Sequence, residues 1–97
     1  MQIRLTRSAE EDLVRGMEFY DAQQQSLGTY FLDSLSADID SLMLYAGIHG
    51  KPTGRFHRAL SKRFPFAIYY EVKNDVITVV AILDCRQNPR AIRARLI

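Results

Sequence analysis

The sequence contains one cysteine, no tryptophan and only two histidines among its 97 residues. The single Cys85 excludes an internal disulfide and any metal site built from several cysteines. His49 and His57 lack the partner spacing of a metal site or a catalytic triad, and no phosphate-binding loop or dinucleotide fingerprint occurs. We therefore expect no cofactor and no bound metal.

Long apolar runs are also absent. No stretch approaches the ~18 apolar residues of a membrane-spanning helix, and the opening MQIRLTRSAEED does not have the pattern of a signal peptide. The hydrophobic fraction of 47% and the charged fraction of 25% are typical of a globular domain. We expect a single domain over residues 1–97, located in the cytoplasm and without a membrane partner.

Basic residues are scarce in the first half of the chain. Residues 1–50 carry three basic side chains and eight acids, a formal charge of −5, whereas residues 51–97 carry ten basic side chains and three acids, a formal charge of +7. This asymmetry has two interpretations. The basic surface either binds an anionic partner or is simply solvated.

The first half of the chain has the patterns of one strand and two helices. Residues 2–6 alternate apolar and polar side chains, as a short strand does. Ser8 and Glu11 match a capping box and predict a helix that begins there, with its acids, Asp12 among them, on the solvent side. Apolar residues at helical spacing predict a second helix over about residues 27–45.

The second half has the patterns of three strands. A strand at residues 56–60 precedes two strands that are joined at Asn74-Asp75, and Asn88-Pro89 opens a short helical segment. The expected fold is α+β with the order β-α-α-β-β-β. In it, an N-terminal strand and an antiparallel helical hairpin pack on a small, mainly antiparallel sheet that a short C-terminal helix follows.

The register of the hairpin leads to a candidate site. A two-residue turn places Lys73 opposite Val76, and continued alternation ends with Arg63 opposite Arg86. Two neighbouring like charges favour an anionic group between them. The same register predicts the pairs Val72–Ile77, Tyr70–Val79, Tyr69–Val80, Ile68–Ala81, Ala67–Ile82, Phe66–Leu83 and Pro65–Asp84.

We therefore predict a site that binds an anion or a target protein around Arg63 and Arg86. Its further members are Lys62, Arg90 and Arg58, because guanidinium and ammonium groups bind phosphates and carboxylates alike. In the alternative interpretation, Arg86 and Arg63 only pair with Asp84.

Three other side chains are candidates for chemistry. His57 lies in a basic strand and is either a general acid or base or an ordinary surface residue, whereas His49 is interpreted as a loop residue. The charge of Arg86 would lower the pKa of Cys85. However, the register places the Cys85 side chain with Leu83 on the opposite face, so we expect a buried structural cysteine.

Two segments carry a resemblance to a known family. Arg63-Phe64-Pro65-Phe66 leads into a strand, and the next strand ends at Cys85-Arg86-Gln87-Asn88-Pro89. With the order of elements, these segments resemble the RelE/ParE toxin superfamily, and in particular its ParE-like plasmid stabilisation branch. The resemblance covers almost the whole chain. It implies the toxin of a type II toxin–antitoxin module, neutralised by a co-encoded antitoxin protein.

The superfamily has two activities, since RelE-like members cut messenger RNA in the ribosome and ParE-like members inhibit DNA gyrase. The resemblance places a RelE-type arginine at Ala67, a second arginine at Arg86 and a tyrosine near Ile92. Only Arg86 is retained, and alanine and isoleucine neither donate a proton nor stabilise charge. We therefore expect gyrase inhibition by binding and no enzymatic activity.

Two alternatives remain open. One is a ribosome-dependent mRNA endoribonuclease that uses Arg86, Arg63, His57 and Lys62. The other is a non-toxic regulatory subunit that only binds the antitoxin. The sequence leaves the oligomeric state undetermined.

Overall fold

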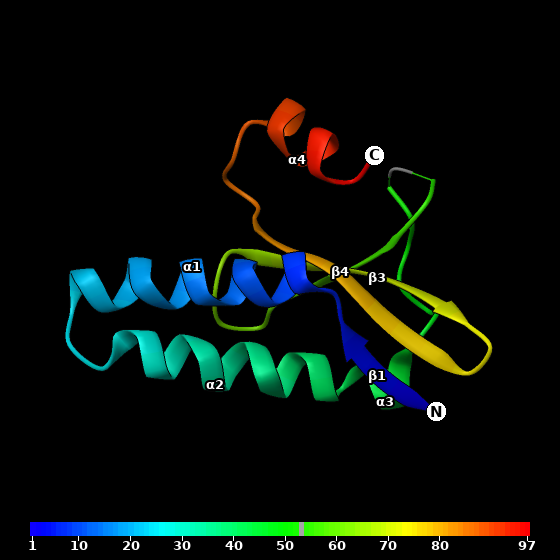
Figure 1. Ribbon diagram of the computed structural model, residues 1–97, viewed down its shortest axis with the longest axis horizontal. Helices are drawn as coiled ribbons and strands as arrows, with labels where there is room; N and C mark the ends of the chain where they lie inside the picture. The colour runs from blue at the N-terminus through cyan, green and yellow to red at the C-terminus, as the bar shows by residue number, and fades with distance from the viewer. Residues whose placement is uncertain (53) are drawn as a thin grey trace.

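The computed structural model describes residues 1–52 and 54–97. The elements are β1 (Gln2–Leu5), α1 (Arg7–Gln23), α2 (Leu27–Asp40), α3 (Leu42–Tyr45), β2 (His57–Leu60), β3 (Phe66–Lys73), β4 (Val76–Asp84) and α4 (Pro89–Arg95). Helices α1 and α2 run side by side as a hairpin, and α4 lies well apart from α2 (Figure 1). The predicted α+β class, the order of elements and the C-terminal helix are confirmed.

The strands form one mixed sheet in the order β1-β4-β3-β2. Strand β1 runs parallel to β4, whereas β3 is antiparallel to both β4 and β2. The two most apolar strands, β3 and β4, are therefore central, where both faces of a strand are covered. No helix in the described part of the chain has the length and apolar character needed to cross a membrane.

The hairpin turn forms where the sequence predicts it. Asn74 and Asp75 have φ angles of 50° and 64°, as a two-residue hairpin turn with two left-handed positions requires. Next to the turn, the predicted pairs Lys73–Val76, Val72–Ile77 and Tyr70–Val79 are confirmed.

Further from the turn, the predicted register is wrong. Tyr69 pairs with Ala81 while Tyr70 pairs with Val79, so Val80 is an extra residue in β4. This bulge shifts the remaining pairs to Ile68–Ile82, Ala67–Leu83 and Phe66–Asp84. Because β3 begins at Phe66 and β4 ends at Asp84, the predicted pairing of Arg63 with Arg86 does not occur.

The helix boundaries also differ from the prediction. Helix α1 begins at Arg7 rather than at Ser8, because Thr6 is the N-cap and its hydroxyl accepts a hydrogen bond of 3.1 Å from the Ala9 N–H. The second predicted helix is divided at Ser41 into α2 and α3. The Ser41 hydroxyl donates to the Asp38 carbonyl at 2.6 Å at this break.

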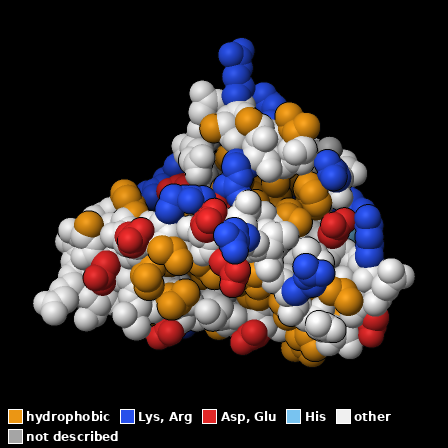
Figure 2. Space-filling model, in the orientation of Figure 1, with side chains coloured by type: hydrophobic (Ala, Val, Ile, Leu, Met, Phe, Trp, Pro, Cys, Tyr) orange, Lys and Arg blue, Asp and Glu red, His pale blue; other side chains and the backbone are white. Residues whose placement is uncertain are grey.

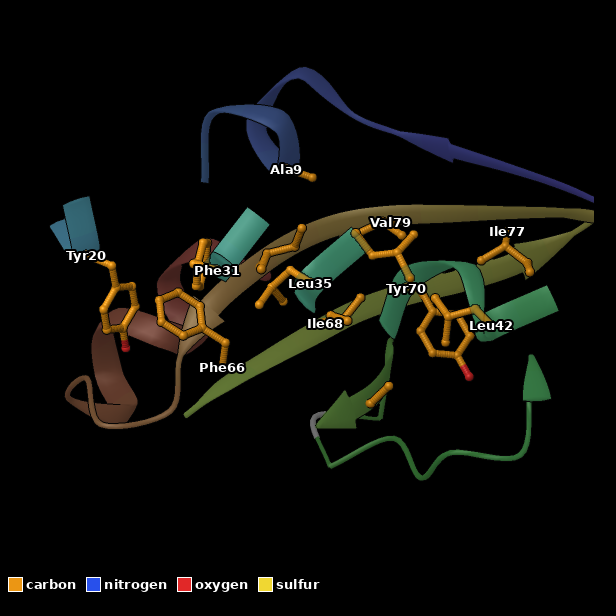
Figure 3. Close-up of a cluster of buried hydrophobic side chains, with 13 residues drawn as sticks. Ala9, Tyr20, Phe31, Leu35, Leu42, Phe66, Ile68, Tyr70, Ile77 and Val79 are labelled. Atoms are coloured by element: carbon orange, nitrogen blue, oxygen red, sulfur yellow. The ribbon is translucent and has the colours of Figure 1, made fainter. Parts of the chain in front are cut away.

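The larger core lies between the sheet and the α1–α2 hairpin (Figure 3). Phe31 from α2 packs against Tyr20 and Phe66, with ring centroids 5.2 and 4.9 Å apart. The two helices approach closely at Gly16, where a Cβ atom would lie 2.5 Å from Cζ of Phe31. This face therefore needs glycine in the middle of α1.

A smaller apolar cluster covers the opposite face of the sheet. Its buried members are Phe56, Ala67, Tyr69, Ala81, Leu83 and Leu96, with Val80 and Ile92 packed against them. Ile92 lies in α4 and Leu96 directly follows it. Helix α4 thus packs over the face that α1 and α2 leave open, and a cavity remains beside it.

Candidate anion-binding site

A cavity of about 680 Å³ lies between α4, β3, Pro52 and the segment 55–58. The C-terminal end of the chain and the segment around residue 55 lie close together above the sheet (Figure 1). We call this space the α4 cavity. Its described lining residues are Pro52, Arg55, Arg58, Tyr69, Cys85, Gln87, Pro89, Ile92, Arg93, Leu96 and Ile97.

Three arginines give the α4 cavity its charge. Arg55, Arg58 and Arg93 line it, and none of its described lining residues is acidic. Within the described part of the chain, no carboxylate forms a salt bridge with any of the three. Lys and Arg side chains project around α4, whereas most Asp and Glu side chains on the same view lie over the α1–α2 hairpin (Figure 2). The described side chains that line the cavity therefore include cations and no acid.

The base of the cavity is apolar apart from one tyrosine. Tyr69 is only 3% exposed, and its hydroxyl has no hydrogen-bond partner among the described residues. No buried side-chain nitrogen or oxygen in the described structure lacks a partner. The Tyr69 hydroxyl oxygen is therefore not completely buried, and Tyr69 lines the cavity.

Cys85 also lines this cavity. Its side chain is exposed, so the prediction of a buried structural cysteine is wrong. The bulge at Val80 and the end of β4 at Asp84 remove the strand alternation on which that prediction depended. Partial burial raises the pKa of the Cys85 thiol, and the nearby Arg58 charge only offsets this in part. The thiol is therefore not an activated nucleophile.

The structure distributes the predicted site residues over several places. Arg58 lines the α4 cavity, and Arg90 is an exposed residue of α4 outside the lining. Lys62 and Arg63 line a separate pocket of about 280 Å³ against α2. Sequence reasoning missed Arg55 and Arg93, because their proximity depends on how α4 folds back over the sheet.

Arg86 lies in neither pocket but pairs with Asp84. The Arg86 Nε and Nη2 atoms donate to the two Asp84 oxygens at 3.0 and 2.7 Å, and Nη2 also donates to the Tyr20 hydroxyl at 3.5 Å. The hydrogen bonds from the Arg86 side chain, and then the one from its backbone N–H, lower the pKa of the Asp84 carboxyl. The alternative interpretation, an Asp84–Arg86 ion pair, is confirmed for Arg86.

Arg63 does not share that carboxylate. Its Nη1 donates to the Tyr30 hydroxyl at 3.1 Å, and its guanidinium carbon lies 5.8 Å from the centre of the Tyr30 ring. Within the described structure it forms no salt bridge, so its charge is available to a partner.

The two histidines lie on the helix-covered face, away from the α4 cavity. His57 pairs with Tyr70 across β2 and β3 and stacks on its ring at 5.0 Å. The His57 Nδ1 donates to the His49 carbonyl at 2.6 Å, and the His49 ring is hydrogen-bonded to the Tyr70 hydroxyl. Burial and then the neighbouring His57 lower the pKa of His49. The predicted loop position of His49 is confirmed.

Asp12 is a further residue whose position the sequence did not reveal. It is 4% exposed, so its predicted place on the solvent side of α1 is wrong. One carboxylate oxygen accepts a hydrogen bond of 3.0 Å from the buried Ile82 N–H of β4. Arg95 donates to both oxygens at 2.7 and 2.9 Å, and Arg15 also pairs with this group. Asp12 thus connects α1, β4 and α4.

No protein-family model matches the sequence, and no curated protein matches it at a significant level. Among solved structures, a chain of one described as "Chromosomal ParDE TA system from P. aeruginosa" superposes with a TM-score of 0.76 and 21% sequence identity. The match covers 84% of this chain and 92% of that chain. The two chains share one fold. This fold is consistent with the resemblance to the RelE/ParE superfamily.

Proposed function

We propose that this protein is the toxin of a type II toxin–antitoxin module, that a co-encoded antitoxin neutralises it, and that it inhibits DNA gyrase by binding. The observation that carries the proposal is the fold that the chain shares with a chain of the ParDE structure. Fold alone does not determine function, so the argument also depends on the chemistry of the exposed groups.

That chemistry favours binding over catalysis. General acid–base catalysis needs a side chain that exchanges a proton at the reacting atoms. Ala67 is fully buried and paired with Leu60 and Leu83, and Ile92 is part of the apolar wall of the α4 cavity. Arg86, the one residue retained from the RelE-type set, is engaged by Asp84.

The cationic groups that remain free suit an acidic protein surface. Arg55, Arg58 and Arg93 surround one cavity, and Arg63 lies over the ring of Tyr30 on another part of the surface. Exposed arginines with neighbouring aromatic rings are typical of protein–protein contact sites. We assign the target contacts to these arginines rather than to Arg86 or Arg90.

The test is a supercoiling assay with purified gyrase and the full chain. We expect inhibition by the unmodified protein and a loss of at least about tenfold in potency for Arg58→Glu, since a charge-assisted contact contributes about 1.5–3 kcal/mol. Lys73→Glu is the matched control, because Lys73 is equally basic but lies beside the hairpin turn. Absence of inhibition at high protein concentration would refute gyrase as the target.

One observation favours the endoribonuclease as a second candidate. Tyr69 lines the same cavity as Arg58 and Arg93, which places a proton donor beside cations. Primer extension on messenger RNA from a translation extract tests it. Cuts in phase with codons that disappear in Tyr69→Phe would establish this activity instead. Growth that is unaffected by induced expression would reject both activities in favour of a subunit that only binds the antitoxin.

A further inference from the structure

We propose that His49 and Tyr70 form a pH-sensitive attachment, and that protonation of His49 releases the segment 46–49 from Tyr70 while the rest of the fold persists. The inference goes beyond the proposed function, because it concerns a conformational change of this chain and is independent of the target. It depends on two hydrogen bonds that meet at one buried hydroxyl and on the low burial of the attached segment.

The attachment is centred on the hydroxyl group of Tyr70. Tyr70 lies in β3 and is completely buried in the larger core (Figure 3). The Gly47 N–H donates to its hydroxyl at 3.1 Å, and Nδ1 of His49 is hydrogen-bonded to the same oxygen. Within the described structure these are the two partners of that hydroxyl. The segment that follows α3 is thus attached to a central strand through a single oxygen atom.

The number of available protons determines the state of His49. A tyrosine hydroxyl donates one hydrogen bond and can accept others. The Gly47 N–H can only donate, so it uses an acceptor position of the Tyr70 oxygen. The hydroxyl proton then requires Nδ1 of His49 as its acceptor, because a buried donor without a partner is unfavourable. His49 is therefore neutral in this arrangement, with its proton on Nε2.

Protonation of His49 removes this acceptor. Both ring nitrogens of an imidazolium carry protons, so the Nδ1–H group and the Tyr70 O–H would meet as two donors. Burial, and to a smaller extent the charge of His57, lower the pKa of His49, which is the direction expected where the fold holds the neutral form. Acidification therefore acts directly on a hydrogen bond that holds the segment.

His57 does not respond to a proton in the same way. Its Nδ1 donates to the His49 carbonyl at 2.6 Å, and protonation at Nε2 would leave this donor in place. The Arg58 N–H donates to the Gly50 carbonyl at 2.9 Å, and neither of these groups titrates. Both bonds come from β2. The chain around residue 50 therefore stays on this edge strand when the segment before it opens, and the change is local.

The neighbouring charges do not compensate a proton on His49. The titratable and charged side chains of the adjoining strands are His57, Arg58, Glu71 and Lys73, and those of the adjoining helices and loop are Asp38, Asp40, Tyr45 and Lys51. Arg58 lines the α4 cavity on the opposite face, and strand alternation places Glu71 on that face too, where it pairs with Lys73 at 3.5 Å. Asp38 accepts a hydrogen bond from the Ser61 hydroxyl at 2.7 Å, and Asp40 is exposed. No carboxylate among the described residues forms a salt bridge with either histidine.

The attached segment contributes little packing of its own. None of the residues 46–50 is buried, and the Ile48 side chain is 73% exposed. Gly47 and Gly50 have no side chains that could pack. Regions with few buried apolar contacts open at a lower free energy than the core. Loss of the hydrogen bonds to Tyr70 should therefore open this segment while β3 and β4 remain folded.

The opening is next to the α4 cavity. The chain continues from this segment to Pro52 and Arg55, which line that cavity. The segment and its attachment therefore hold the N-terminal end of this part of the cavity lining. Protonation of one histidine would make the position of the lining depend on pH.

Hydrogen exchange of the full chain, resolved by NMR, tests the inference. Rates are compared at about pH 7.5 and about pH 5, after correction for the intrinsic effect of pH on exchange. We expect the protection of the Gly47 amide to fall at least about tenfold at the lower pH. Amides of β3 and β4 should stay at least about a hundredfold more protected than Gly47 at that pH. The midpoint of the loss should coincide with the titration of the His49 ring rather than the His57 ring.

Two tyrosine variants form a matched pair. Tyr70→Phe removes the buried hydroxyl and keeps the ring, so the Gly47 amide should exchange rapidly at both pH values. Tyr45→Phe removes the hydroxyl of a half-exposed tyrosine beside the segment, and the loss of protection at low pH should remain. His49→Gln, at a partly exposed position, keeps an acceptor that does not titrate. Its Gly47 protection should change less than about threefold between the two pH values, and this variant serves if Tyr70→Phe does not fold.

Several results would overturn the inference. One is a Gly47 amide whose protection does not change between the two pH values, and another is a loss that persists in His49→Gln or follows the titration of His57. A third is equal protection of Gly47 and the amides of β3 and β4 at low pH, which would indicate unfolding of the whole chain. A negative supercoiling assay would refute only the gyrase proposal.

Discussion

Replacing Asp12 with alanine removes a carboxylate that three elements share. The buried Ile82 N–H then loses its acceptor, which costs about 1–3 kcal/mol. Arg95 and Arg15 lose a partner as well, but their side chains are 33% and 61% exposed, so water replaces much of that interaction. We expect the free energy of unfolding to fall by about 2–4 kcal/mol, below the upper limit for a fully buried ion pair.

Urea unfolding followed by circular dichroism measures this change. Thermal unfolding gives a second measure, since in a chain of this size a loss of about 2–4 kcal/mol corresponds to a fall of roughly 10–25 °C in the midpoint temperature. Asp12→Asn should lie between the unmodified protein and Asp12→Ala. Its amide oxygen still accepts the hydrogen bond from Ile82, although the charge that attracts Arg95 is lost.

Two arginine variants separate the contributions to this effect. Arg15→Ala should cost at most about 1 kcal/mol because its ion pair is solvated. Arg95→Ala should cost more, since Arg95 makes two hydrogen bonds that hold α4. Two results would refute the connecting role of this carboxylate. One is a free energy of unfolding of Asp12→Ala within about 0.5 kcal/mol of that of the unmodified protein. The other is an Asp12→Ala variant that is no more destabilised than Arg15→Ala.

Two further changes test the packing and the pH dependence of the fold. Gly16→Ala should lower the free energy of unfolding by about 1–3 kcal/mol, because the new Cβ would lie 2.5 Å from Cζ of Phe31. Gly50→Ala is the control, since the space around Gly50 is open. Equal stabilities of the two variants in urea would contradict the close packing at Gly16. Burial, and to a smaller extent the charge of His57, hold the pKa of His49 below its ordinary 6.5. The unfolded chain therefore binds the proton more readily than the folded chain. As a consequence, stability should decrease as the pH falls from about 6.5 through the pKa of the folded state. His49→Gln should make this decrease smaller when urea midpoints are compared at about pH 7.5 and about pH 5. The same change in midpoint between the two pH values as in the unmodified protein would show that His49 is not the group responsible.

The hairpin shows how far the sequence determines the register. Turn residues that tolerate positive φ locate Asn74-Asp75, and strand alternation then places the neighbouring pairs correctly. The bulge at Val80 leaves no such signal, because the residues around it are apolar and fit either face of a central strand. The predicted meeting of Arg63 with Arg86 failed for two reasons, since the bulge shifts the register and both residues lie beyond the ends of their strands.

The position of Asp12 could not be inferred for a related reason. It follows two other acids in the chain, and all three would be acceptable on a solvated helix face. What distinguishes it is tertiary, since β1 pairs with β4 only as far as Val79. Beyond that point the Ile82 N–H has no strand on this side, and a buried backbone donor needs an acceptor.

The α4 cavity depends on the same carboxylate. Helix α4 has seven residues, which is too short for a helix to be stable without tertiary contacts. Its contacts include the packing of Ile92 and Leu96 on the sheet and the two hydrogen bonds from Arg95 to Asp12. Because α4 also supplies Ile92 and Arg93 to the cavity, the residues that hold the helix in place determine whether the binding site exists.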